Sequence, residues 1–201
     1  MGSYTTKPLT QEEYQLLVNT INKGYTDTKI NPATGLPIVH EPNRRVAAVL
    51  IIQRHLGLRL SDVLKLKRED IISDGAGYRL DDTIEQKTKH KRHLTIDSAV
   101  KKFFDEYRDS IGIEYGPVFR ISTDCVQKAV REASRFLGMR HVNSHSVRKL
   151  AGITIYNATG HDLEAAREFY GHSSIVNTGI YLRQDSQQLK EAIHNTVDIP
   201  I

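Results

Sequence analysis

A histidine and an arginine three residues apart, His145 and Arg148, are the side chains of this sequence best suited to hold a phosphate. A spacing of three places both on one face of a helix. The guanidinium offers a planar fork of donors, and the first turn of a helix, which Ser144 would cap, offers free N–H groups. The pair predicts a phosphate site, and a solvated surface helix is the simpler alternative if the pair is taken alone.

Basic clusters elsewhere in the chain indicate a polyanionic partner. The 201 residues include 28 Lys and Arg against 24 Asp and Glu, which leaves a net charge of +4 and a pI near 9.1. Because this excess is small, its distribution matters more than its total. Basic residues gather within 65–68, 87–92, 131–140 and 148–149. Such clusters favour a nucleic-acid partner, or else they are solvated helix faces.

Five sequence elements together resemble the tyrosine recombinase (integrase) family. The stretch Ser144-His-Ser-Val-Arg-Lys149 resembles the family's HxxR motif, and Tyr170-Gly-His-Ser-Ser-Ile175 resembles its GH[SH]S element. Tyr181 follows His172 by nine residues, as the family's tyrosine does. Two upstream stretches resemble the family's first arginine box and its lysine-bearing turn: His55-Leu-Gly-Leu-Arg-Leu-Ser-Asp-Val-Leu-Lys-Leu66 and Gln86-Lys-Thr-Lys-His-Lys-Arg92.

The resemblance implies a cationic clamp around a scissile phosphate. Arg59 and Arg148 would hold the non-bridging oxygens, and His172 would donate a hydrogen bond to the same phosphate. His145 would lie near the nucleophile as an acid or base. Attack on phosphorus builds negative charge on these oxygens, and fixed donors stabilise that charge without a metal. Outside the family context, Arg59 pairing with Asp62 is the simpler interpretation.

The resemblance also implies the nucleophile and the general acid. Tyr181 would attack phosphorus and form a 3′-phosphotyrosyl link, which stores the bond energy, so that no cofactor is expected. Lys87 would protonate the leaving 5′-oxygen, and its neighbour Lys89 is the alternative. No metal site is expected. The residues expected to contact DNA are Lys89, Lys91, Arg92 and Lys149.

The sequence departs from the family pattern at two places. His55-Leu56 stands where the family usually has Thr, and Tyr170 stands where it often has Leu. Neither is expected to touch a catalytic atom. Tyr156 and Tyr170 are expected to pack in the core.

The sequence predicts that the elements which position these residues are mainly α-helices with a small antiparallel β-sheet (α+β). The resemblance implies the tyrosine recombinase catalytic-domain fold. Short β segments at 71–72, 78–80, 83–85 and 93–96 predict about three strands, with Asp81-Asp82 as a turn and a hairpin tip at Lys87–Lys91. Residues 24–43, rich in Pro and Gly, predict a long loop. Capping residues and apolar periodicity predict helices over 10–22, 43–56, 60–66, 98–108, 123–137, 145–157, 162–169, 174–182 and 186–194.

The chain is expected to divide into three parts. Residues 1–3 are interpreted as a start codon and cloning remnant, residues 4–185 as the catalytic domain, and residues 186–201 as a C-terminal tail helix. That tail is expected to be exchanged between protomers, with permanent packing on its own domain as the alternative. The family's N-terminal core-binding domain is expected to be absent from these residues, which predicts a fragment of a longer protein.

The predicted function is site-specific DNA strand exchange by a homotetramer on double-stranded DNA, with an accessory DNA-bending or directionality factor as a further partner. A single Cys125, no secretory signal and no run of roughly 18–20 apolar residues suggest a cytoplasmic protein. Two alternatives stay open. One is a relaxing enzyme similar to type IB topoisomerases. The other is a non-catalytic DNA-binding regulator, which should have lost a catalytic residue.

Overall fold

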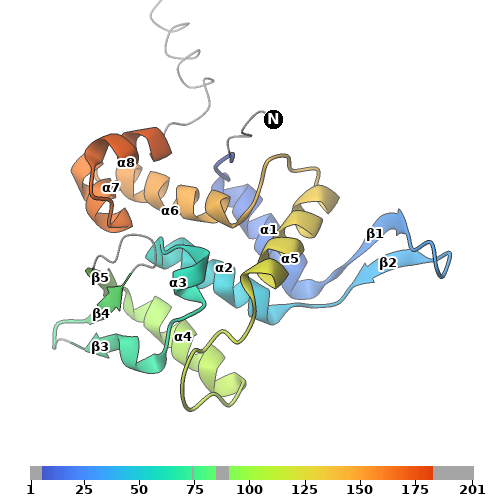
Figure 1. The fold of residues 1–201 in the computed structure, drawn as a ribbon, viewed down its shortest axis with the longest axis horizontal. Coiled ribbons are helices and arrows are strands. Elements are labelled where there is room, and N and C mark those ends of the chain that lie inside the picture. The colour runs from blue at the N-terminus through green and yellow to red at the C-terminus, as the bar shows by residue number, and fades with distance from the viewer. Residues whose placement is uncertain (1–5, 74, 85–90, 183–201) are drawn as a thin grey trace, which may run out of the picture.

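The computed structural model describes residues 6–73, 75–84 and 91–182, and all structural statements concern these residues (Figure 1). The helices are α1 (Gln11–Lys23), α2 (Arg44–Leu56), α3 (Leu60–Val63), α4 (Ser98–Ser110), α5 (Thr123–Phe136), α6 (Ser144–Ala158), α7 (Leu163–Tyr170) and α8 (Ile175–Leu182). The strands are β1 (Tyr25–Ile30), β2 (Pro37–His40), β3 (Ile71–Ser73), β4 (Tyr78–Ile84) and β5 (Lys91–Ile96). The predicted class, mainly helical with small antiparallel sheets, is confirmed.

Helix α2 forms the centre of the core. Its apolar run from Val46 to Ile52 is buried almost all round, as expected of a helix without a polar face. The Asn43 side chain caps the start by accepting from the Val46 N–H at 3.0 Å, and Gly57 ends the helix in the left-handed conformation. Helices α1 and α6 both pack against α2, so the core links the first and last thirds of the domain.

The loop predicted over residues 24–43 is wrong for half of its length. Residues Tyr25–Ile30 and Pro37–His40 pair as an antiparallel hairpin that projects from the helical body (Figure 1). Thr, Tyr, Ile and Val in these segments favour strands. Pro37 is tolerated because it stands at the first position of β2. Pro32 and Gly35 belong to the turn, where Asn31 and Leu36 close the loop through a 2.8 Å backbone bond, whereas Gly24 and Pro42 flank the hairpin.

The three-stranded sheet is confirmed, with strand order β3-β4-β5 and antiparallel pairing throughout. Asp81-Asp82, predicted as a turn, instead lie inside the continuous strand β4. A register shift between Leu80 and Thr83 accommodates them, which is how a bulge keeps a strand unbroken across poor strand formers. The predicted hairpin tip, including Lys87 and Lys89, lies outside the described residues.

Helices α6, α7 and α8 form the C-terminal part of the described chain, beside α2 and α3 (Figure 1). Asn143, rather than the predicted Ser144, caps α6: its side chain accepts from the His145 N–H at 2.8 Å. Gly171, at a φ of 65°, ends α7 and turns the chain into α8. No helix of the described ranges has the length and apolar character needed to cross a membrane.

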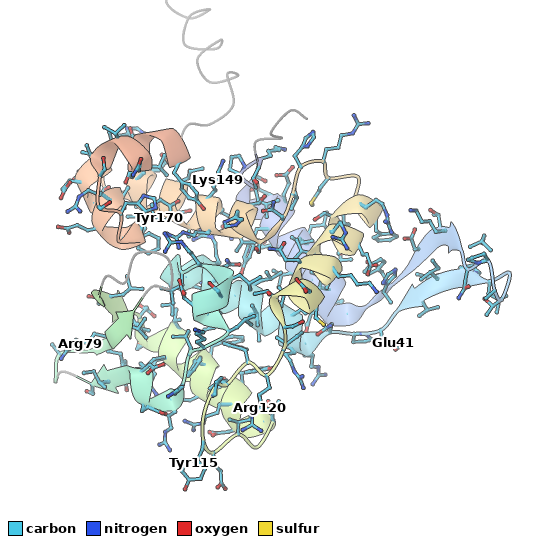
Figure 2. The ribbon with its side chains drawn as sticks, viewed as in Figure 1. Glu41, Arg79, Tyr115, Arg120, Lys149 and Tyr170 are labelled. Carbon is cyan, nitrogen blue, oxygen red and sulfur yellow. The ribbon has the colours of Figure 1, made fainter. Side chains whose placement is uncertain are left out.

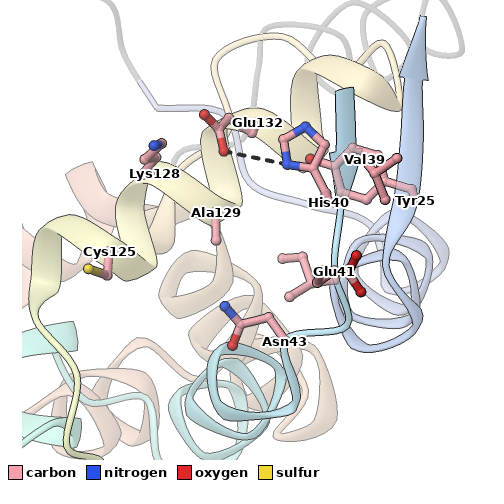
Figure 3. Close-up of a pocket in the computed structure, with 10 residues that line it drawn as sticks. Tyr25, Val39, His40, Glu41, Asn43, Cys125, Lys128, Ala129 and Glu132 are labelled. Atoms are coloured by element: carbon pink, nitrogen blue, oxygen red, sulfur yellow. Dashed lines mark ion pairs between the residues drawn. The ribbon is translucent and has the colours of Figure 1, made fainter. Parts of the chain in front are cut away.

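A cavity of about 380 Å³ lies where the base of the hairpin meets α5 (Figure 3). Tyr25 stacks on His40 with ring centroids 4.3 Å apart, and His40 Nδ1 lies 3.8 Å from a carboxylate oxygen of Glu132 on α5. These contacts attach the hairpin to the body. None of the predicted catalytic residues that the structure describes lines this cavity.

Candidate active site

A second cavity, of about 320 Å³, brings together five of the six residues predicted as catalytic. They come from three separate segments: the residue before α3, the first turns of α6, and the stretch from the end of α7 through α8. Ser173 and Asn177 also line this cavity and were not singled out from the sequence. The five predicted residues are Arg59, His145, Arg148, His172 and Tyr181. The sixth, Lys87, lies outside the described residues.

Gly57 explains how Arg59 reaches the cavity. A Cβ at Gly57 would lie 2.3 Å from the Phe169 ring, so only glycine allows the end of α2 to pack this closely against α7. Its left-handed conformation also favours glycine. Leu58 is then fully buried, and Arg59, the half-buried N-cap of α3, follows at the cavity wall. The glycine and leucine of the arginine box therefore place the arginine.

Arg148 is the most deeply buried cation of the cavity, with 2% of its surface exposed. Its Nη2 donates to the Tyr170 carbonyl at 3.2 Å. The guanidinium carbon lies 5.2 Å from the centroid of the Tyr170 ring and 6.0 Å from that of Tyr181. Burying a cation costs free energy, and an anion bound in the cavity would offset that cost. The site therefore suits a phosphate.

Tyr181 lies half-buried at the end of α8, in contact with both His172 and Arg148. Burial raises the pKa of its phenol, while the positive charges of Arg148 and Arg59 oppose that rise. At neutral pH the residue is therefore a protonated phenol. A phenol acts as a nucleophile only after it loses its proton, and the nearby positive charges of Arg148 and Arg59 would stabilise the resulting oxyanion.

His172 is held from several sides. Its ring stacks on Tyr170 with centroids 4.9 Å apart and meets Tyr181 edge-on at 5.6 Å. Nδ1 lies 3.0 Å from the Thr178 hydroxyl oxygen, and the His172 carbonyl accepts from Arg167 at 2.9 Å. Its orientation is thus set by packing before any substrate binds. His145, by contrast, is exposed at the start of α6.

Tyr170 was expected to pack in the core without touching a catalytic atom, and the second half of that expectation is wrong. It is fully buried between α6 and α7 (Figure 2). Its hydroxyl donates to the carbonyls of Arg148 and Lys149 at 3.1 and 3.2 Å, while its own carbonyl accepts from Arg148. Gly152 makes room, because a Cβ there would lie 1.9 Å from the Tyr170 hydroxyl. The sequence signal that could have revealed this role is that Tyr170 stands where the family often has Leu.

Lys149, expected to contact DNA, is buried instead, with 8% of its surface exposed. Its ammonium donates to the Thr6 carbonyl at 2.8 Å and lies 5.6 Å from the Tyr181 ring centroid. The chain segment before α1 packs over this part of α6 and accepts the hydrogen bond of the lysine. Lys91 and Arg92 lie on β5, the strand that follows the hairpin tip, and Lys89 falls outside the described residues. Across the described ranges, no group of three potential ligands could hold a metal.

Comparisons with known proteins match most of the chain to one family. Residues 7–188 match the phage integrase family. The tyrosine recombinase XerC of Caldanaerobacter subterraneus subsp. tengcongensis is 23% identical over 198 residues, which cover 92% of this chain and 50% of that protein. The probable integrase/recombinase YoeC of Bacillus subtilis is 28% identical over 159 residues, which cover 75% of this chain and 83% of that protein. The chain spans about half the length of the XerC relatives it matches.

Solved structures show the same fold. XerH site-specific recombinase bound to palindromic difH substrate, in a post-cleavage complex, matches with a TM-score of 0.68 at 21% identity, covering 95% of this chain and 53% of that chain. A lambda integrase dimer bound to a COC' core site matches with a TM-score of 0.69 at 16% identity, covering 100% of this chain and 65% of that chain. At these identities the likeness establishes the architecture alone. With the family match over residues 7–188, it shows that this chain belongs to the phage integrase family of tyrosine recombinases.

Proposed function

We propose that this chain cleaves and rejoins double-stranded DNA in site-specific recombination, with Tyr181 as its nucleophile. The observation that carries the proposal is the convergence of Arg59, His145, Arg148, His172 and Tyr181 on one cavity, from segments far apart in the chain. The chain has kept all the catalytic residue types, which argues against a non-catalytic regulator. The recombinases and integrases among its relatives support the same chemistry.

The cavity residues divide the reaction between them. The Tyr181 oxygen forms a bond to phosphorus while the bond from phosphorus to the 5′-oxygen breaks. His145 accepts the phenolic proton, and Lys87 gives a proton to the leaving 5′-oxygen. Arg59 and Arg148 stabilise the charge that builds on the non-bridging oxygens. Attack of a 5′-hydroxyl on the phosphotyrosine reverses these steps and reseals a strand without a nucleotide cofactor.

The assembly follows from the need to exchange strands between two duplexes. A homotetramer on DNA supplies four such sites, and Lys89, Lys91 and Arg92 contact the backbone near each of them. The tail, residues 186–201, docks on a neighbouring protomer, and an accessory DNA-bending or directionality factor sets the direction. These events take place in the cytoplasm of a bacterial or phage-infected cell. Deleting residues 185–201 should leave the melting temperature unchanged and abolish strand exchange; a large fall in melting temperature would make the tail part of the core.

A nicked suicide duplex tests the chemistry directly. The duplex should span the ends of the DNA element that encodes the chain. A nick close to the cleavage site lets the short cleaved product diffuse away, which traps the covalent complex. The wild type should form an SDS-resistant protein–DNA adduct, and Tyr181→Phe should bind the duplex without forming it. Tyr156→Phe is the matched control, because Tyr156 does not line the cavity. An adduct formed by Tyr181→Phe would overturn the assignment of the nucleophile.

A further inference from the structure

A buried threonine, Thr178, contacts one edge of the His172 ring. None of its surface is exposed. Its hydroxyl oxygen lies 3.0 Å from Nδ1 of His172 and 3.4 Å from the Ser174 carbonyl oxygen, one helical turn earlier. Since Thr178 is fully buried and does not line the cavity, its hydroxyl faces the protein and not the substrate. Any influence on the reaction must therefore act through His172.

The hydroxyl has one proton and two neighbours, which allows two arrangements. A carbonyl oxygen only accepts, so the contact with Ser174 becomes a hydrogen bond only if the hydroxyl donates to it. The hydroxyl oxygen then accepts from a protonated Nδ1 of His172. If the hydroxyl instead donated to an unprotonated Nδ1, no hydrogen would lie between the Thr178 hydroxyl oxygen and the Ser174 carbonyl oxygen, and that contact would not be a hydrogen bond. Only the first arrangement makes both contacts hydrogen bonds. A threonine hydroxyl within a helix commonly donates to the carbonyl four residues earlier, which here also accepts the Thr178 backbone N–H at 3.3 Å.

We propose that Thr178 is a positioning residue that holds neutral His172 as its Nδ1–H tautomer, through a relay from Nδ1–H to the Thr178 hydroxyl and on to the Ser174 carbonyl. In this tautomer Nε2 of the neutral ring carries a lone pair and no proton. His172 therefore donates from Nε2 to a phosphate only after it takes up a proton from solvent. This consequence rests on the proposed function, since it requires a phosphate in the cavity.

The groups that face His172 set the electrostatics of that proton uptake. Tyr170 and Tyr181 cover the ring, and the cations Arg59 and Arg148 line the same cavity. These cations oppose a further positive charge on the His172 ring. A bound phosphodiester reverses the balance, because its negative charge favours the imidazolium. Proton uptake by His172 should therefore accompany phosphate binding, and cleavage should weaken as the pH rises.

Nitrogen NMR measures the tautomer without any DNA. Long-range proton–nitrogen spectra of histidine-labelled protein distinguish the two ring nitrogens at about pH 8.5, roughly two units above the ordinary histidine pKa. His172→Gln assigns the signal by removing it. The wild type should show a protonated Nδ1 and a bare Nε2. Thr178→Ser should keep this pattern, whereas the nearly isosteric Thr178→Val should shift the tautomer ratio toward Nε2–H by about tenfold, the worth of one hydrogen bond.

Two results would overturn the proposal: a protonated Nε2 in the wild type, or an unchanged tautomer ratio in Thr178→Val. If the valine variant fails to fold, the wild-type spectrum still decides. Cleavage of the suicide duplex supplies the functional arm. The ratio of wild-type to Thr178→Val cleavage should be higher at about pH 6.5 than at about pH 8.5, whereas a purely structural role would lower cleavage equally at both. Because the spectra need no substrate, failure of the Tyr181 chemistry would leave them unchanged.

Discussion

Tyr170 and Gly152 fit together so closely that the effect of substituting either residue on the stability of the domain depends on the other. A Cβ at residue 152 would lie 1.9 Å from both Cζ and the hydroxyl oxygen of Tyr170, and 2.2 Å from Cε2. Leucine at residue 170 lacks all three of these atoms. We therefore expect Gly152→Ala to destabilise the wild type but to be tolerated in a Tyr170→Leu background.

The magnitude follows from two opposing effects. Alanine in the interior of α6 gains about 1 kcal/mol over glycine in helix propensity. Against the ring of Tyr170, overpacking costs at least about 1–3 kcal/mol, so the wild-type background loses stability. In the Tyr170→Leu background the overpacking is absent, so only the gain in helix propensity remains. Because the helix gain is the same in both backgrounds, the two substitutions should be coupled by the overpacking cost, about 1–3 kcal/mol, with the double variant more stable than the sum of the single variants predicts.

Urea or thermal denaturation of the four proteins measures this coupling. For a domain of this size, about 1 kcal/mol corresponds to roughly 2–4 °C in melting temperature. Tyr170→Phe is the matched control: it removes only the hydroxyl bonds to two helix carbonyls, and should cost about 1 kcal/mol. Additivity within about 0.5 kcal/mol would refute the argument, because the ring would then not occupy the space beside Gly152.

Three further predictions concern the cavity and the core. Arg59→Ala or Arg148→Ala should lower single-turnover cleavage by about 100–1000-fold while lowering DNA affinity far less, because the clamp acts on transition-state charge; equal losses would make both arginines simple backbone anchors. Cleavage should survive excess EDTA, since none of the described residues that line the cavity carries a carboxylate, and rescue by Mg²⁺ after EDTA inhibition would contradict the mechanism. Burial raises the pKa of Tyr14 to about 12, so the fold favours the neutral phenol: its contribution is complete below about pH 10 and is lost as the pH rises toward 12. Denaturation across this range should show a smaller loss in Tyr14→Phe, by up to about 1.4 kcal/mol per pH unit, than in the exposed control Tyr115→Phe.

The β1–β2 hairpin shows where local signals mislead. Proline and glycine punctuation predicted one long loop, yet each strand is stabilised by a partner some ten residues away. The ring of Tyr25 also packs against that of Phe136 on α5, with ring centroids 4.5 Å apart. These two residues lie too far apart in the sequence for any local pattern to predict the contact. Strand pairing is non-local, so the turn residues located the bend but not the strands that flank it.

The sequence by itself predicted the bounds of the main helices and, through its resemblance to a family, named five residues that line one cavity. Caps and apolar periodicity act within a turn or two, which is why α2 and α6 begin and end within a residue or two of their predicted bounds. The spacing of His145 and Arg148, and the nine residues from His172 to Tyr181, are likewise properties of the chain alone.

Only the tertiary structure decided what surrounds those residues. It buried Lys149 beneath a segment more than a hundred residues away, and it made Tyr170 a support for Arg148 and His172. It also placed Thr178 against the His172 ring. Burial and hydrogen bonding of a side chain depend on which distant segments pack over it, and that packing is a property of the whole fold rather than of any stretch of sequence.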